Sequence, residues 1–152
     1  RPPHAHHRAR PDRARHDRVA GKLIAARVLH PRMIVVTNRI PVAPGWEEKF
    51  EDRFSKRAHL VDRSPGFVRN EVHRPQPMKL DHATGTWSPD PDGAAFYEVK
   101  TWWRTFDDFV AWTKSPSFRE AHADRPPTEM FAGKNVLEIH EVFLSTDEGD
   151  AG

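Results

Sequence analysis

The sequence predicts an α+β domain in which helices cover one face of a small antiparallel sheet. Runs of alternating apolar and polar residues indicate strands, and amphipathic runs with helical spacing separate them along the chain. The chain of 152 residues is long enough for one such domain with a hydrophobic core. We place the domain at residues 33–145, between a disordered basic N-terminal tail, residues 1–32, and a disordered acidic C-terminal tail, residues 146–152.

The first strand is predicted around residues 34–42, where β-branched residues dominate. Counting by twos puts four aliphatic side chains and one carboxamide on the same face, which should therefore be buried. The five residues of that face are Ile34, Val36, Asn38, Ile40 and Val42. A buried carboxamide without hydrogen-bond partners costs roughly 1–3 kcal/mol. Asn38 must therefore have a partner, and it is the first candidate functional residue.

A helix and a second strand follow Pro44-Gly45. Apolar residues at spacings of four and three predict an amphipathic helix that ends before Ser64-Pro65-Gly66. Its apolar positions are Trp46, Phe50, Phe54, Ala58 and Val61. The second strand is predicted over residues 67–74, and residues 75–94, which contain many Pro and Gly turn signals, are predicted to form a long loop.

The third strand is predicted over residues 95–103, and its alternation separates two adjacent tryptophans. Trp103 shares a side with Tyr97, whereas Trp102 shares the wetter side with Glu98. A shift of one residue in register would exchange the two indoles. We assign Trp103 to the apolar face.

Two helical units and a last strand complete the domain. Thr105 begins a capping box, and Ser115-Pro116 has the form of a second helix start. His122 follows Phe118 by four residues and so shares its apolar stripe. With a last strand over residues 136–144, the order is β-α-β-β-α-β, the ferredoxin-like arrangement.

Helices on one side leave the other face of this antiparallel sheet uncovered. A second copy of the chain is the simplest cover for such a face, since most soluble oligomers are symmetric homo-oligomers. We therefore expect a homodimer whose two sheets form a dimeric α/β barrel.

The composition excludes several kinds of site. The sequence has no Cys, which excludes disulfides, thiolate metal sites and cysteine nucleophiles. It has no apolar run of the roughly 18–20 residues that span a bilayer and no apolar segment of the signal-peptide type near its start, so we expect a soluble, cytoplasmic protein without a membrane partner. Any metal must be bound by His or oxygen ligands.

The formal charge of +2 is divided unevenly along the chain. Residues 1–32 hold nine basic residues against two acidic ones and carry +7, which leaves −5 for the rest. The domain itself is therefore not expected to bind nucleic acid. For the His- and Arg-rich tail we consider a transit peptide, a nucleic-acid-binding arm, a weak metal-binding tract and an upstream extension before a natural start at Met33.

Asn38, Trp103 and His122 stand out because they are predicted on apolar faces. Each has an ordinary structural explanation, since inward His and Trp residues usually belong to a core and an inward Asn often bonds to nearby backbone. Together they fit a cleft between sheet and helices with an aromatic wall, an amide donor and an imidazole. A neutral imidazole in an apolar cleft is the arrangement that an axial haem ligand requires.

With these residues the chain resembles the dimeric ferredoxin-like superfamily of antibiotic-biosynthesis monooxygenases and, within it, the IsdG-type haem-degrading monooxygenases. The resemblance covers about residues 33–145 and is carried by Thr37-Asn38-Arg39-Ile40, by Phe50–Phe67 and by Trp102–His122. It implies an enzyme for which haem is both cofactor and substrate. In such an enzyme dioxygen is consumed, a reductase or a small reductant supplies electrons, the porphyrin is opened and iron is released.

The resemblance also implies roles for three residues. The family uses an Asn on the first strand, a Trp on the third strand and a His near the end of the later helical segment, and these fall on Asn38, Trp103 and His122. His122 would bind the haem iron proximally, and Asn38 would donate a hydrogen bond to the bound oxygen. Trp103 would press on the macrocycle and distort it.

Other basic side chains add candidates. Arg39, Arg119 and Arg125 could meet the haem propionates, although solvated surface arginines are an equally good explanation. His59, within the first predicted helix, is a competing ligand, but its charged neighbours favour an exposed position.

Two other functions stay open on this sequence. The same superfamily contains cofactor-free quinol and polyketide monooxygenases, whose pockets do not need an iron ligand at His122. A non-catalytic dimer that carries haem without degrading it would need only His122. Addition of hemin and then of a reductant separates all three functions.

Overall fold

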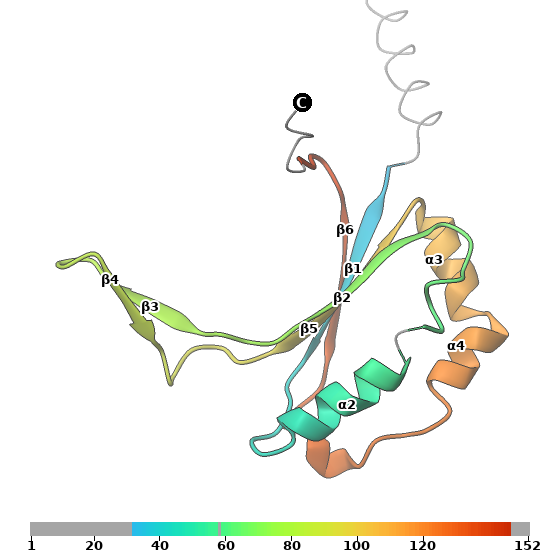
Figure 1. Cartoon of the computed structure of the whole chain (residues 1–152). Helices are drawn as coiled ribbons and strands as arrows, with labels where there is room; N and C mark the ends of the chain where they lie inside the picture. Colours follow the sequence, from blue (N-terminus) through green and yellow to red (C-terminus); the bar gives the residue numbers. More distant parts are fainter. Residues whose placement is uncertain (1–31, 58, 147–152) are drawn as a thin grey trace, which may run out of the picture. The chain divides into compact units, whose positions relative to one another are not determined.

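The computed structural model describes residues 32–57 and 59–146. Its elements, labelled as in Figure 1, are β1 (Ile34–Ile40), α2 (Glu47–Arg57), β2 (Phe67–His73), β3 (Met78–Asp81), β4 (Thr86–Pro89), β5 (Tyr97–Trp103), α3 (Phe106–Thr113), α4 (Pro116–Ala121), the short 3₁₀ helix η1 (Thr128–Met130) and β6 (Val136–Glu141). Apart from Arg32 and Thr146, the two predicted tails lie outside the described residues. Within the described ranges, no helix is long and apolar enough to cross a membrane.

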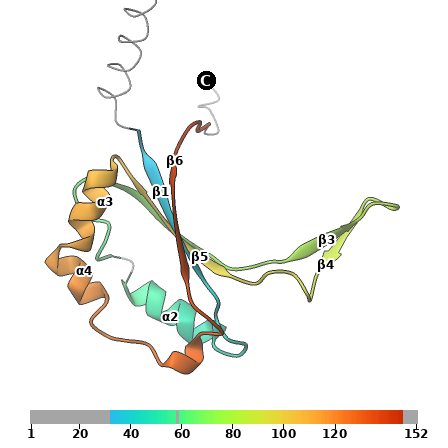
Figure 2. The same ribbon diagram turned by 180° about the vertical axis from the view of Figure 1, so that it is seen from behind.

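Four strands form one antiparallel sheet in the order β2-β5-β1-β6. Central β1 pairs with β5 and β6, so that Asn38 lies opposite Val99 on one side and Leu137 on the other. Figures 1 and 2 show α2, α3 and α4 on one side of this sheet. The ferredoxin-like order predicted from the sequence is confirmed, with one hairpin added.

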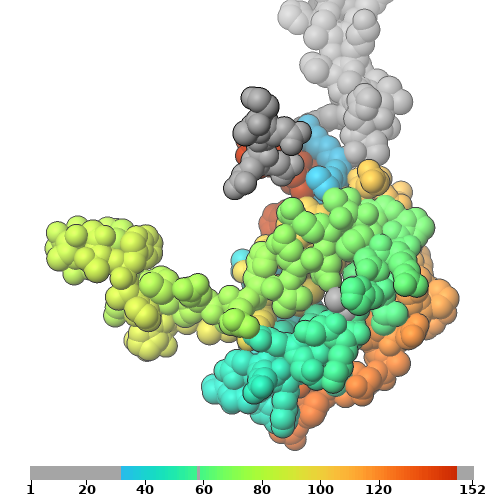
Figure 3. All heavy atoms as spheres, viewed as in Figure 1, coloured from blue at the N-terminus to red at the C-terminus, as the bar shows by residue number. Residues whose placement is uncertain are grey.

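Residues 75–94, predicted to be a loop, contain the hairpin β3-β4. The Gly85 amide closes its turn by donating to the Asp81 carbonyl, and Gly85 has a φ of +69°, which favours glycine. The prediction was wrong here because four-residue strands give no clear alternation, so the turn residues dominate the pattern. Figures 1 and 2 show the hairpin as an arm that leaves the sheet beyond β2 and β5, and the space-filling view in Figure 3 shows the same projecting arm in yellow-green. Trp87 on this arm is 62% exposed.

The side chains between sheet and helices pack as two separate apolar clusters. One cluster is centred on Trp103, which is fully buried, and includes Val36 of β1. The other is centred on Phe50 and includes Ile40 of β1. Asn38 lies between Val36 and Ile40 on the same face and belongs to neither cluster. The apolar core is therefore interrupted at the one carboxamide of the β1 face.

Side-chain caps fix where α3 and α4 begin, as the sequence predicts. Thr105 Oγ1 and Ser115 Oγ each accept a hydrogen bond, at 3.1 Å, from the backbone amide three residues later. The helix α2 is shorter than predicted, since it ends at Arg57. The chain then tightens into turns, with the Leu60 amide bonded to the Arg57 carbonyl at 3.2 Å.

Candidate active site

The interruption in the core is a cavity between the sheet and the helices. Two adjoining hollows, of 220 and 340 Å³, share four lining residues, Asn38, Phe54, Arg57 and His122. The first hollow is lined in addition mainly by apolar side chains, including Leu60, Val61, Phe109, Trp112, Phe118 and Leu137. A concave, largely apolar site with a few polar groups is typical of small-molecule binding.

The Asn38 side chain has one hydrogen-bond partner among the described side chains. Its Oδ1 accepts from Nδ2 of Asn135, just before β6, at 3.1 Å. Because this bond occupies the acceptor end, both protons on Nδ2 of Asn38 are left to donate. The need for a partner, predicted from the strand pattern, is met by Asn135, and the donor end stays available to a ligand.

The His122 imidazole is held with one nitrogen engaged and one free. His122 is the C-cap of α4, and its Nδ1 lies 2.7 Å from the Phe118 carbonyl oxygen. A carbonyl can only accept, so Nδ1 carries the proton and Nε2 has the free lone pair. The ring stacks on Phe118 with centroids 4.0 Å apart. His122 is exposed, unlike a core histidine, and it lines both hollows.

Trp103 does not line the cavity, although it lies on the predicted face of the sheet. Its indole is fully buried, and its Nε1 donates to Oγ1 of Thr101 at 2.9 Å. It packs on Trp112 of α3 with ring centroids 6.3 Å apart, and Trp112 lines the first hollow. The helix α3 packs on β5 and covers Trp103, so the indole that lines the first hollow is that of Trp112. Direct contact between Trp103 and a macrocycle stays a prediction.

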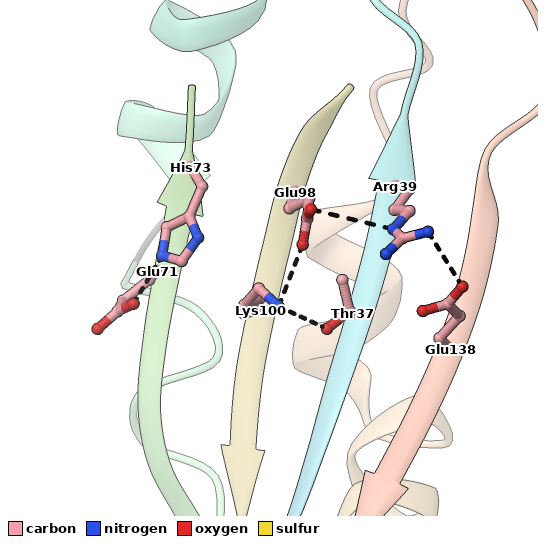
Figure 4. Close-up of polar contacts among 7 residues, drawn as sticks. All are labelled: Thr37, Arg39, Glu71, His73, Glu98, Lys100 and Glu138. Atoms are coloured by element: carbon pink, nitrogen blue, oxygen red, sulfur yellow. Dashed lines mark hydrogen bonds and ion pairs between the residues drawn. The ribbon is translucent and has the colours of Figure 1, made fainter. Parts of the chain in front are cut away.

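Arg39 and Arg119 lie away from the cavity. Arg39 points to the opposite face of the sheet, where it pairs with Glu98 at 3.9 Å and with Glu138 at 3.3 Å (Figure 4). It follows Asn38 directly, so the alternation of a strand places it on the other face. Arg119 is exposed on α4. Neither lines either hollow, and their contact with haem propionates stays a prediction.

Arg57 is a cavity residue that the sequence reasoning missed. It lines both hollows at the end of α2, and its guanidinium lies 4.5 Å from the Phe54 ring centroid. Burial, and then the nearby charge of Arg53, lowers the pKa of Arg57. No ion pair of Arg57 occurs within the described residues. Helical spacing from Phe50 through Phe54 was the signal that could have found it, whereas Arg125 is exposed and lines neither hollow.

A second carboxamide, Asn70, lines the first hollow from β2. It is paired with Thr101 of β5 in the sheet register. Its Oδ1 is buried and has no hydrogen-bond partner in the described part of the chain. Asn70 shares the helix-facing side of β2 with Val72, as Asn38 shares its side of β1 with aliphatic residues. The same strand argument could therefore have found it.

The opposite face of the sheet carries a polar network (Figure 4). Lys100 Nζ lies 3.1 Å from Glu98 and donates to Oγ1 of Thr37 at 3.2 Å. His73 and Glu71 are bonded at 2.7 Å. Thr37 is only 3% exposed, so its hydroxyl is satisfied within this network. We call this side the outer face.

His59, the competing imidazole, lies outside the cavity. Its side chain is 85% exposed, it hydrogen-bonds to Asp62 at 3.2 Å, and it lines neither hollow. Within the described residues, no group of three His, Cys, Asp or Glu side chains could hold a metal ion. The imidazole of His122 among the apolar walls of the cavity fits haem iron, whose porphyrin supplies most of its ligands.

Comparison with known proteins identifies the family. Residues 33–124 match the model of the antibiotic biosynthesis monooxygenase family. The chain belongs to this family. The matched segment runs from β1 through α4 and contains Asn38, Arg57 and His122. The resemblance predicted from the sequence is therefore confirmed at the level of the family.

Several relatives of this monooxygenase-family chain are named for haem degradation. A heme oxygenase (staphylobilin-producing) of Staphylococcus haemolyticus is 41% identical over 96 residues, which are 63% of this chain and 79% of that protein. A heme oxygenase (mycobilin-producing) of Mycobacterium tuberculosis is 33% identical over 119 residues, 78% of this chain and 95% of that protein. These relatives match most of their own length.

Solved structures share the fold. The heme-degrader MhuD of Mycobacterium tuberculosis, with two hemes bound in its active site, is 31% identical with a TM-score of 0.56, over 75% of this chain and 99% of that chain. A point variant of SnoaB, a cofactor-independent oxygenase of Streptomyces nogalater, is 18% identical with a TM-score of 0.52, over 77% of this chain and 99% of that chain. The second likeness concerns the fold alone.

Proposed function

We propose that the protein is a haem-degrading monooxygenase that binds haem in the cavity and opens the porphyrin oxidatively. One observation carries the proposal. His122 and Asn38 line the same largely apolar cavity, and the bonds they form engage Nδ1 of one and Oδ1 of the other, which leaves Nε2 and Nδ2 for a ligand. The relatives named as heme oxygenases support this function over others found on the same fold.

His122 is the proposed proximal ligand of the haem iron. Donation from Nδ1 to the Phe118 carbonyl fixes the tautomer and makes Nε2 a better ligand. Stacking on Phe118 holds the plane of the ring. Because His122 is exposed at the end of α4, a porphyrin can reach it without opening the core.

Asn38 is the proposed catalytic donor. Its Nδ2 protons are free while its oxygen is bonded to Asn135, so it donates a hydrogen bond into the cavity. This donation favours oxidation of the porphyrin itself, because a fixed donor stabilises negative charge where it develops during reaction.

Trp112 is the proposed side chain that presses on the macrocycle, since it lines the cavity. Trp103 supports it from behind, with its own ring fixed by the bond to Thr101. Trp103 is thus a positioning residue in this proposal and Trp112 the contact. Distortion of the macrocycle is one way in which a protein tunes haem reactivity.

Arg57 is the proposed partner for a haem propionate. It lines both hollows, and its guanidinium forms no ion pair within the described residues. A carboxylate beside this half-buried charge would gain charge-assisted hydrogen bonds that a solvated arginine offers only weakly.

Haem is the substrate in this proposal and supplies the iron at which dioxygen is activated. Oxidative opening of the porphyrin by dioxygen consumes electrons, so the proposal includes a reductase or a small reductant as their source. Iron would leave the cavity when the macrocycle opens.

We propose that a second copy of the chain covers the outer face, as a dimeric α/β barrel. Figures 1 and 2 show that the helices of the described residues all lie on the other side of the sheet. Val136 pairs with Arg39 in the sheet register, and Phe96 lines a shallow hollow together with Arg39 and Glu98. These two apolar side chains of the outer face are 51% and 42% exposed. Interfaces between copies combine exposed apolar side chains with polar groups, and this face carries both.

Hemin titration followed by ascorbate under air tests the function. The proposal expects a saturable Soret band that then bleaches as the porphyrin is opened. A band that persists under these conditions would leave only haem carriage. If hemin does not bind and a hydroquinone is oxidised instead, the cofactor-free monooxygenase function replaces the proposal.

A further inference from the structure

The carboxamides of Asn38 and Asn135 bond across 97 positions of the sequence. Asn135 lies just before β6, and its side chain lines the second hollow. Asn38 lies in both hollows. The side chain of Asn135 is exposed, so it contributes little to the core. What it does contribute is one donor, Nδ2, placed 3.1 Å from the oxygen of Asn38.

A carboxamide has nearly the same shape in two orientations, with oxygen and nitrogen exchanged. Packing alone therefore selects weakly between an Asn38 that presents its donor to the cavity and one that presents its acceptor. A hydrogen bond of ordinary strength biases the two orientations by about two- to tenfold. Asn135 is a carboxamide too, and in this structure it presents Nδ2 and not its oxygen to Asn38, which sets the orientation of the bonded pair.

We propose that Asn135 is the positioning residue that turns the donor end of Asn38 toward the haem. This inference rests on the proposed function, since it concerns how Asn38 meets that substrate. Asn135 does not touch the reacting atoms. It acts by occupying the oxygen of Asn38, which leaves Nδ2 as the group that faces the ligand.

Two substitutions separate this role from a merely structural one. Asn135→Ala removes the donor and lets Asn38 take both orientations in comparable amounts, so we expect the rate of Soret bleaching to fall by about twofold or less. Asn135→Asp keeps the shape but can only accept, so Asn38 would donate to it and turn its oxygen to the cavity. The bleaching rate of Asn135→Asp should fall further, below that of Asn135→Ala, while hemin affinity changes by less than about threefold.

A charge control is available next to the site. Asn135→Asp changes the local charge by one unit, and Lys134→Gln changes it by the same amount at a neighbouring exposed position. Lys134→Gln should bleach hemin at the wild-type rate. If it is as slow as Asn135→Asp, the loss comes from charge and the inference is overturned.

Side-chain amide spectra of the ligand-free protein give a readout that does not depend on turnover. In Asn135→Asp the Nδ2 proton of Asn38 donates to a carboxylate and should move downfield in ¹H–¹⁵N spectra. It should not move downfield in Asn135→Ala. Unchanged Asn38 resonances in Asn135→Asp, or an Asn135→Asp enzyme that bleaches faster than Asn135→Ala, would contradict the inference.

The two proposals fail in different ways. If wild-type protein does not bind or bleach hemin, the proposed function fails, while the amide spectra still report whether Asn135 orients Asn38. If hemin is bleached and Asn38→Ala is slow, the double variant Asn38→Ala/Asn135→Ala should be no slower than Asn38→Ala alone. An additive loss would mean that Asn135 acts by another route.

Discussion

The two faces of the sheet are made by the same strands and do different things. On the helix-facing side, apolar residues enclose a cavity in which Asn38 and His122 present a donor and a lone pair. On the outer face, Arg39, Glu98 and Lys100 form a network of ion pairs (Figure 4). Asn38 and Arg39 are neighbours in the sequence but lie on opposite faces of the sheet. Proximity in sequence is a poor guide to a shared site when the residues lie on a strand.

The faces also differ in what their polar groups contribute. The outer ion pairs are partly exposed, with Arg39 and Glu98 side chains 45% and 29% accessible, so each should add little to stability. The polar groups of the cavity are few and lie among apolar walls, where a donor or a lone pair has fewer competing waters. We therefore expect substitutions on the cavity face to change chemistry and those on the outer face to change association.

The largest expected effect is a difference in stability between substitutions of two adjacent residues, Trp103 and Trp102. Trp103→Ala empties a fully buried site in the larger cluster and should lower the free energy of unfolding by about 3–5 kcal/mol. Trp102→Ala, on the outer face, loses a contact with the Arg69 guanidinium at 4.2 Å and should cost about 1 kcal/mol or less. Urea titration of both variants measures the difference. Equal losses would show that the two faces are not distinct in packing.

Adjacent polar residues give the corresponding contrast in catalysis. Asn38→Ala should bind hemin within a few-fold of the wild-type affinity and lose most of the bleaching rate, about tenfold or more, because a fixed donor is removed. Arg39→Ala should leave hemin affinity and bleaching rate unchanged, since Arg39 points to the outer face. Normal bleaching by Asn38→Ala would make Asn38 a structural amide only.

A substitution on the outer face should change the association of the proposed homodimer. Phe96→Glu puts a charge on an exposed aromatic of that face and should shift the proposed homodimer to monomer in sedimentation velocity runs. Phe106→Glu changes an aromatic of similar exposure on α3 and should leave the mass unchanged. A Phe96→Glu protein that stays dimeric would place the interface elsewhere.

The smallest expected effect is on the pH dependence of stability, and it concerns Glu51 at the edge of the helix-facing side. Hydrogen bonds from Arg74 and then Tyr97 lower the pKa of Glu51 to about 2. The unfolded value is about 4.3, so this carboxylate stabilises the fold above that pH and the contribution is lost as pH falls toward 2. Glu51→Gln should weaken the acid dependence of the urea midpoint between these values. An identical dependence in both proteins would rule out the contribution.

Local patterns predicted most of the fold. The caps at Thr105 and Ser115, the face assignment of Trp103 and the partner requirement of Asn38 all follow from spacing and hydrogen-bond needs, and the structure confirms them. Such features depend on residues a few positions apart, or on alternation along one strand. The hairpin in residues 75–94 was not predicted because its strands are too short to show a clear alternation.

The cavity wall depended on information that alternation does not contain. Trp103 and Trp112 both belong to the apolar side, and only the packing of α3 over β5 decides which indole faces the cavity. Arg57 is a charged residue, yet the end of α2 places its guanidinium over the Phe54 ring and makes it part of the cavity wall. Alternation along a strand predicts which face of the sheet a side chain is on. It does not predict how deeply the side chain lies between sheet and helices, and that depth decides which residues line the cavity.

Hemin binding by His122→Ala tests the central claim most directly. Removal of the imidazole should abolish the Soret band of the ligated complex in a hemin titration, because the proposed proximal nitrogen is gone. The matched control is His59→Ala, which removes an exposed imidazole outside the cavity and should give the wild-type titration. An unchanged Soret band in His122→Ala would contradict the account.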